Sequence, residues 1–349
     1  MSFITGFEVI EMLKTMRRLG KPPMRSFHIR SRMMGAADIV GIGDNGVEAV
    51  RRLMESGCEK ATYLVLHRDE KKLRQTKADT IAMKDDSWKV VENVMTAPFE
   101  SLPISYQKFC FYYHTIWRFC YPSLVLADFS EEIGRDAAPA AAKNSTYGST
   151  QKIAVVHVPQ LEKLMDKNEA KTRGTEMYQR FQSLCEDAEA VIAMGDDSSA
   201  SSGAVAARAI AKRQSDFVGD LLLALHGDEE MRLSWQEVRA FLSTGRLSRW
   251  GNLWQAWSSE GADVRTAMAD VQRVLSRGGV LQKAKRVFVM VTGKDEDLAL
   301  PDAQAALGEL KTSLGEKADV MLHINREKKF DDGVRVNMAV RVEMESLIK

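Results

Sequence analysis

The sequence predicts an α/β fold in which a parallel sheet domain is joined by a central helix to a smaller mixed α/β domain. Three observations support this. Short apolar runs alternate with longer amphipathic segments from residue 37 onward, a long alanine- and leucine-rich segment interrupts them near residue 200, and the last apolar run alternates with polar residues. Alternating strands and helices are typical of parallel α/β sheets, and an alternating run is typical of a strand with one solvated face.

In the first half, six short apolar runs have the length and residue types of buried strands. They are ADIVGIG, TYLVLH, DTIAM, SLVLA, KIAVVHV and AEAVIAM, with helices predicted between them from about residues 45 and 69. The first 36 residues stand apart. Apolar residues at Phe7, Ile10, Leu13 and Met16 predict an amphipathic helix there, either docked on its own domain or available to a partner or a membrane surface.

The second half begins with segment 200–226, whose apolar residues nearly surround it, so we expect one buried central helix. Further helices are predicted at about 235–242, 263–276 and 301–314, and strands at WGNLWQAW, RVFVMVTG, ADVMLHI and VRVNMAVRV. We therefore divide the chain into an N-terminal extension (1–36), a first domain (37–199), the central helix (200–226) and a C-terminal domain (227–349).

The composition excludes several classes of function. The 349 residues carry a net charge of +1, which gives no general attraction to nucleic acid or to an anionic membrane. The four cysteines have neither metal-ligand spacing nor the density of a disulfide scaffold, and His114 and His157 are isolated in the sequence. No apolar stretch reaches the length of about 18 residues that a membrane span needs. We expect a cytoplasmic protein with no metal, no nucleic-acid partner and no direct membrane insertion.

The first loop, GIGDNG, matches the G-x-G-x-x-G pattern with Gly41, Gly43 and Gly46, between a predicted strand and a predicted helix. Such glycines let a dinucleotide pyrophosphate approach a helix N-terminus, so an NAD-binding oxidoreductase is one reading. Asp44 lies inside the loop and Glu48 one turn into the helix, and both would oppose a bound phosphate. We expect no NAD binding.

The same segment, ADIVGIGDNGVEAVRRLMESG followed by ATYLVLHRDEKKL, resembles the opening of the tubulin/FtsZ superfamily, and the order of elements stays similar to about Val342. The chain is identified as a divergent FtsZ-like member. The resemblance implies a nucleotide-type first domain and a GTP site between successive subunits. The short segment MESLIK after the last strand leads us to expect no FtsZ-type adaptor peptide.

The family holds the nucleotide phosphates with a glycine-rich loop followed by AAP. In this chain the matching stretch is SEEIGRD, residues 130–136, in which only Gly134 remains and Glu131 and Glu132 replace glycines. A carboxylate about 4 Å from a phosphate charge costs roughly 4 kcal/mol at an effective dielectric near 20. The resemblance therefore implies a degenerate phosphate loop.

Other family positions, carried over one at a time, are also altered. The nucleotide-site positions fall on Glu48, His67, Arg68, Asp69, Glu169, Arg173, Asp196, Ala207 and Ala211, and the catalytic loop of the neighbouring subunit falls on Arg232, Ser234 and Glu237. Glu169 and Arg173 keep the family residue types, as does Asp69 in its segment, and only one of the two catalytic acids remains. Alanine can neither stack on guanine nor form a hydrogen bond with it.

These substitutions lead us to expect a structural protein that neither binds nor hydrolyses GTP and has no cofactor. It would form head-to-tail filaments through Glu131, Glu132 and Asp136 on one subunit and Arg232 on the next, or modulate an active FtsZ- or tubulin-type relative. Two alternatives stay open. The chain could be a GTP-binding, GTP-hydrolysing division protein with GTP or GDP bound, or these charges could be solvated loop residues of a monomer.

Overall fold

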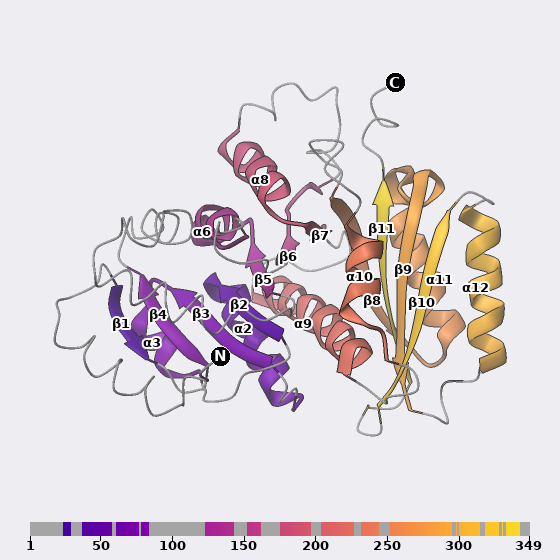
Figure 1. The fold of residues 1–349 in the computed structure, drawn as a ribbon, viewed down its shortest axis with the longest axis horizontal. Coiled ribbons are helices and arrows are strands. Elements are labelled where there is room, and N and C mark those ends of the chain that lie inside the picture. The colour runs from indigo at the N-terminus through magenta and orange to yellow at the C-terminus, as the bar shows by residue number, and fades with distance from the viewer. Residues whose placement is uncertain are drawn as a thin grey trace, which may run out of the picture.

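The computed structural model has a single mixed sheet whose strands run through both halves of the chain (Figure 1). In the described residues this sheet has eleven strands, in the order β1-β4-β3-β2-β5-β6-β7-β8-β11-β9-β10. The structure describes residues 24–28, 37–57, 61–76, 78–83, 123–142, 152–161, 175–196, 204–226, 232–243, 252–294, 298, 300–314, 318–327, 330 and 333–342.

The first half of the sheet is parallel and confirms the six predicted strands. They are β2 (Ala37–Ile42), β3 (Ala61–His67), β4 (Asp79–Met83), β5 (Ser123–Asp128), β6 (Lys152–His157) and β7 (Ala190–Met194). A strand that the sequence did not predict, β1 (Met24–His28), pairs antiparallel with β4 at the edge. Its residues, MRSFH, lack the apolar run by which the other strands were found.

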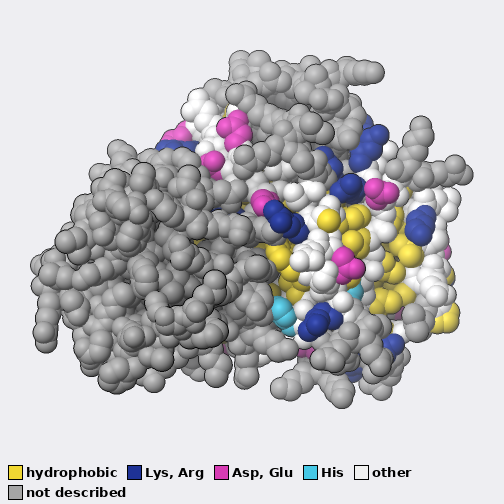
Figure 2. Space-filling view, in the orientation of Figure 1, with side chains coloured by type: hydrophobic (Ala, Val, Ile, Leu, Met, Phe, Trp, Pro, Cys, Tyr) yellow, Lys and Arg dark blue, Asp and Glu magenta, His cyan; other side chains and the backbone are white. Residues whose placement is uncertain are grey.

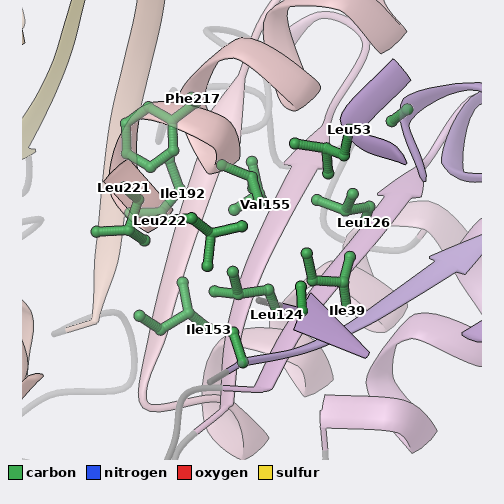
Figure 3. Close-up of a cluster of buried hydrophobic side chains, with 14 of the residues drawn as sticks. Ile39, Leu53, Leu124, Leu126, Ile153, Val155, Ile192, Phe217, Leu221 and Leu222 are labelled. Atoms are coloured by element: carbon green, nitrogen blue, oxygen red, sulfur yellow. The ribbon is translucent and has the colours of Figure 1, made fainter. Parts of the chain in front are cut away.

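Helices cover both faces of this half, as the strand–helix alternation predicts. The core on one face contains residues of α6 (Glu132–Ala142) and α8 (Glu176–Asp187), and the core on the other contains residues of α2 (Gly43–Glu55), α9 (Ala204–His226) and α10 (Trp235–Leu242). Figure 3 shows the second core, where side chains of α9 such as Phe217 and Leu221 pack against β5, β6 and β7. The short α3 (Glu70–Arg74) follows β3.

The second half continues the same sheet. Strand β8 (Leu253–Gly261) is parallel to β7 and antiparallel to β11 (Val334–Val342), which is followed by β9 (Ala284–Gly293) and the edge strand β10 (Asp319–Arg326). Helices α11 (Val264–Ser276) and α12 (Leu300–Leu314) cover one face of these strands. Pairing between β7 and β8 therefore carries the sheet across the boundary that we drew between the two domains.

The expectation that β11 has one solvated face is wrong. Val336 and Met338 point into the core under α11 and α12, while Asn337 and Ala339 are fully buried on the opposite face. That face is covered by α9, because Asn337 donates a hydrogen bond to the side chain of Asp220 in α9. Alternation in this strand separates two kinds of buried environment rather than core from solvent.

Several predicted features lie outside the described residues: the N-terminal helix, and the site positions Glu169 and Arg173. Within the described part of the chain, none of the helices combines the length and the hydropathy that crossing a bilayer requires.

Candidate functional site

The candidate site lies at the carboxyl ends of the parallel strands β2, β5, β6 and β7, the edge at which open α/β sheets place their ligands. Strand β2 passes through Gly43 directly into α2, and β5 leads through a short turn into α6. Gly43 has a φ of +74°, a conformation that side chains disfavour. The preceding residue, Ile42, offers no side-chain cap, so the first amide groups of α2 need acceptors from elsewhere.

Glu131 supplies these acceptors. The backbone N–H groups of Asp44 and Asn45 donate to the two carboxylate oxygens of Glu131, with N···O distances of 2.7 and 2.9 Å. A Cβ atom built on Gly43 would lie only 1.9 Å from Oε2 of Glu131. The carboxylate thus occupies the space in front of the α2 N-terminus, where an external anion would otherwise bind the same N–H groups.

The electrostatic environment of Glu131 is unfavourable for its charge. The pKa of this carboxyl is raised to about 7, mainly by burial and also by the negative charges of Asp128 and Asp44, against the lowering effect of the two amide hydrogen bonds. The amide bonds therefore offset only part of the desolvation. A more highly charged anion at this position would meet the same burial and the same two acids.

Asp44 and Glu48, which we expected to oppose a phosphate, are both paired with cations. The Asp44 carboxylate lies 2.7 Å from Nε2 of His67 and forms an ion pair with Lys72, and these contacts lower its pKa although burial acts in the other direction. Glu48 pairs with two arginines of its own helix, Arg51 and Arg52. The Asp44 side chain thus joins α2 to the β3–α3 segment.

A second polar cluster adjoins Glu131. His157 is buried, and its two ring nitrogens lie 2.7 Å from Oδ1 of Asp128 and 3.1 Å from Oδ1 of Asp196. Asp128 also accepts a hydrogen bond from the side chain of Asn45. Asp196 accepts one from the backbone N–H of Gln160, at 2.8 Å. The cluster links the ends of β5, β6 and β7 to α2.

Sequence reasoning missed this cluster. It treated His157 as isolated and assigned no role to Asp128, although Asp128 directly follows one predicted strand and His157 lies near the end of the next. In the structure they end β5 and β6 and are directly paired in the parallel register of these strands. Polar residues that end neighbouring parallel strands were the available signal. Asp196, predicted as a site residue, is half-exposed and does belong to the cluster.

The remaining residues of the acidic loop are also engaged within the chain. A Cβ atom on Gly134 would lie 2.1 Å from the carbonyl oxygen of Asp128, which explains why this one family glycine is required here. Glu132 is exposed and lies 3.4 Å from a guanidinium nitrogen of Arg68. Asp136 is mostly buried and lies 3.6 Å from Arg180, and burial raises its pKa.

The two alanines of α9 at which the resemblance predicted the base contacts differ in burial. Ala207 is half-buried, whereas Ala211 is fully buried in the core that α9 shares with the sheet. One turn further along, the buried Gln214 donates to the carbonyl oxygens of Ala127 and Val155, at 2.8 and 3.1 Å. This face of α9 is used for docking the helix on the sheet.

The predicted partner loop lies at the start of α10. Ser234 caps the helix, and the carboxylate of Glu237 accepts a hydrogen bond from the backbone N–H of Ser234 at 2.8 Å. The one remaining acid of this loop is therefore part of a capping box. Arg239 pairs with Glu189 at 3.2 Å. Arg232 is exposed, and among the described residues no ion pair involves it.

No family model and no curated protein matches the sequence, but solved structures match the fold. An FtsZ dimer, empty, from M. jannaschii shares 16% identity over 97% of this chain and 93% of its own, with a TM-score of 0.68. CetZ from Methanosaeta thermophila shares 12% sequence identity over 89% of this chain and 88% of its own, with a TM-score of 0.60. CetZ2 from Haloferax volcanii, a GTPγS-bound protofilament, shares 16% sequence identity over 89% of this chain and 96% of its own, with a TM-score of 0.58. The chain therefore has the fold of the tubulin/FtsZ superfamily.

Proposed function

We propose that this chain is a cytoplasmic, FtsZ-like cytoskeletal protein that neither binds nor hydrolyses GTP, and that it assembles through protein contacts alone or with a nucleotide-binding relative. The observation that carries the proposal is the position of Glu131. Its carboxylate accepts hydrogen bonds from the two N–H groups of α2 that a phosphate at this edge of the sheet would need. The absence of a base-binding side chain at Ala207 and Ala211 adds support.

The assembly part of the proposal rests on likeness of fold. One of the similar structures is an FtsZ dimer and another is a CetZ2 protofilament. In a head-to-tail contact the acidic loop of one subunit would meet the loop before α10 of the next. Because Glu131 is bound inside its own subunit, Glu132 is the exposed carboxylate of this loop that can reach Arg232 of a neighbour.

Charge alone does not describe the surface available for such a contact. Figure 2 shows that hydrophobic side chains gather over the C-terminal strands on one face, with acidic and basic side chains interspersed among them. Leu233, Trp235 and Phe241, at and near α10, are only partly buried against the core. We therefore expect a subunit contact with an apolar part, and only a moderate dependence of assembly on salt.

The first test is the nucleotide content of the purified protein. Denaturing the purified protein should release no GDP or GTP that chromatography can detect. Its GTPase activity should not exceed background. The melting temperature of the protein should not rise when GTP or NAD is added. Binding would be detected, because a ligand at about 100 times its dissociation constant stabilises a protein by about 2.7 kcal/mol. Stoichiometric guanine nucleotide would contradict the proposal and favour a conventional GTPase. A higher melting temperature with NAD would favour an NAD-binding oxidoreductase.

The second test concerns assembly. Sedimentation and electron microscopy should show the same polymer with and without GTP, and Arg232→Glu should abolish pelleting by placing like charges opposite each other. Adding Glu132→Arg to that variant should restore pelleting in part. Arg273→Glu, which alters an exposed arginine on α11, is the matched control and should pellet like the wild type. Unchanged pelleting of Arg232→Glu would show that the two loops do not meet.

A further inference from the structure

Two buried histidines occupy equivalent places at the carboxyl edge of the sheet, but their partners differ. His67 is the last residue of β3, and His157 is the last residue of β6. Nδ1 of His67 accepts a hydrogen bond from the backbone N–H of Asp69, and Nε2 donates to the carboxylate of Asp44, each at 2.7 Å. One ring nitrogen therefore has no proton, and His67 is a neutral imidazole.

The partners of His157 leave neither ring nitrogen as an acceptor. The two nitrogens face the carboxylates of Asp128 and Asp196, at 2.7 and 3.1 Å, and an ionised carboxylate can only accept. Both oxygens of Asp128 also accept from other donors, the backbone N–H of Ser130 at 2.7 Å and the side-chain amide of Asn45. These hydrogen bonds require both nitrogens of the His157 ring to be protonated.

The contact between His157 and Asp196 also holds a strained piece of backbone. Gln160 has a φ of +52°, and in the described part of the chain it is the one residue other than glycine with a positive φ. Its backbone N–H donates to Oδ2 of Asp196 at 2.8 Å, while Oδ1 of the same carboxylate faces the ring. Asp196 thus ties the residues after β6 to the ring, and its half-exposed side chain has water as an alternative partner.

We propose that His157 is a doubly protonated, cationic cross-link at neutral pH, and that loss of one ring proton at alkaline pH opens its contact with Asp196 and releases Gln160. An unprotonated nitrogen presents a lone pair to a carboxylate, and the two repel each other. Asp196 moves because it is half-exposed, whereas the buried Asp128 keeps its N–H partner. The cross-link is therefore present at neutral pH and lost as the pH rises. This switch goes beyond the proposed function and does not depend on the exclusion of nucleotide.

The charges around the ring favour its cationic form. Asp128 and Asp196 contact His157 from both sides, and in the described part of the chain no arginine or lysine forms an ion pair with either acid. Burial would raise the pKa of Asp128, but contact with the ring outweighs burial and lowers it, so this carboxylate is ionised. Glu131 adds a further acid, close enough to Asp128 for the charge of Asp128 to raise its pKa.

The helices packed on this side of β6 contribute neutral groups to the cluster. From α2, the side chain of Asn45 contacts Asp128, and from α9 the side chain of Gln214 contacts the carbonyl groups of Ala127 and Val155. Charged residues of these helices pair elsewhere: Asp44 with Lys72, Glu48 with Arg51, and Lys212 with Asp216. Among the described residues, two carboxylates thus set the charge of the ring without a competing cation.

The first test observes the wild type by NMR of histidine ring nitrogens at pH 8, where an ordinary histidine carries one ring proton. His157 should show two protonated nitrogens and His67 only one, with the signals assigned from His157→Gln and His67→Gln. When the pH is raised further, His157 should lose one proton. The backbone N–H of Gln160 should then exchange with solvent roughly fivefold or more faster than the intrinsic effect of pH on exchange accounts for.

The second test removes one carboxylate from the ring. Asp196→Asn should lower the proton affinity of the His157 ring by about tenfold or more, because an opposite charge is lost. Glu309→Gln removes an exposed carboxylate on α12 and is the matched control, in which the ring should titrate as in the wild type.

Four results would overturn the inference. A single ring proton on wild-type His157 at pH 8 would show that the ring is not a cationic cross-link, and equal titration of the ring in Asp196→Asn and wild type would show that Asp196 does not hold its charge. A ring that keeps both protons until the protein unfolds would not be a switch. An unchanged exchange rate of the Gln160 N–H after the ring loses its proton would show that Gln160 is not released.

Discussion

Two carboxylates of this molecule, the half-buried Glu131 and the fully buried Asp220, are held in opposite ways. At the site, Glu131 is bound by backbone N–H groups, with no cation paired to it among the described residues. Between α9 and β11, the fully buried Asp220 is bound by the guanidinium of Arg335, whose Nε lies 3.0 Å from it, and by the side chain of Asn337. Asp216 joins this second cluster through Arg335 at 3.2 Å.

The presence or absence of a paired cation decides which of the two arrangements titrates near neutral pH. Burial would lower the pKa of Arg335, but Asp220 and Asp216 outweigh it and raise the pKa above its ordinary value, so this cation stays charged. Glu131 has only dipoles for partners, and its pKa lies at about 7. A buried charge with a counterion acts as a permanent structural link, whereas a buried charge held by amides titrates near neutral pH.

The largest expected effect comes from breaking the α9–β11 cluster. Arg335→Ala leaves Asp220 buried without its cation, so we expect a loss of about 3–5 kcal/mol in the free energy of unfolding. Chemical denaturation measures this. Arg273→Ala is the control, because Arg273 is 60% exposed in a pair with Asp270 and should change stability by no more than about 1 kcal/mol. Equal losses in the two variants would show that the buried Arg335–Asp220 pair contributes no more to stability than an exposed ion pair.

The next effect is a pH dependence that belongs to Glu131. A carboxyl whose pKa rises from 4.5 in the unfolded chain to about 7 in the fold stabilises the protein below pH 4.5 and loses that contribution as the pH rises to 7. Relative to Glu131→Gln, which does not titrate, the wild type should therefore lose roughly 3 kcal/mol across this range. Denaturant titrations of both proteins at several pH values measure the difference, and parallel curves would show that Glu131 is not buried as described.

A smaller effect tests the close approach on which the site depends. Gly134→Ala places a methyl group 2.1 Å from the carbonyl oxygen of Asp128, so the start of α6 must shift, at a cost of about 1–3 kcal/mol. Gly308→Ala in α12 is the matched control. Nothing lies within 4 Å of its added methyl group, and we expect a gain of about 0.4–1 kcal/mol. Melting temperatures that move in the same direction would contradict this contrast.

The smallest effect is expected at the exposed end of the His157 cluster. Asp196→Asn keeps an oxygen that can accept from the backbone N–H of Gln160, and the side chain of Asp196 is 52% exposed, so stability should fall by no more than about 1 kcal/mol. Asp128→Asn, at the buried end of the same histidine, should cost more. If both substitutions lower stability by the same amount, burial does not decide how much each carboxylate contributes.

Much of the fold could be predicted from the sequence because its signals are local. The six parallel strands of the first half, the central helix and helix α10 were found from apolar runs and periodicity, which depend on neighbours in the chain. The resemblance of element order to the tubulin/FtsZ superfamily named the fold that the solved structures match. The acidic residues Glu131 and Glu132 lie at the turn from β5 into the start of α6, the strand-to-helix turn where the sequence placed them.

The sequence by itself thus determined where the strands, helices and unusual acids lie, and only the tertiary structure decided what those acids contact. Glu131 turns inward because α2, more than eighty residues earlier, presents two uncapped amides beside it. Asp128 and His157 meet because β5 and β6 are neighbours in register. Strand β11 is buried on both faces because α9 crosses behind it. Hydrogen bonds and burial of this kind join distant segments, and the periodicity of one segment carries no information about which other segment will cover it.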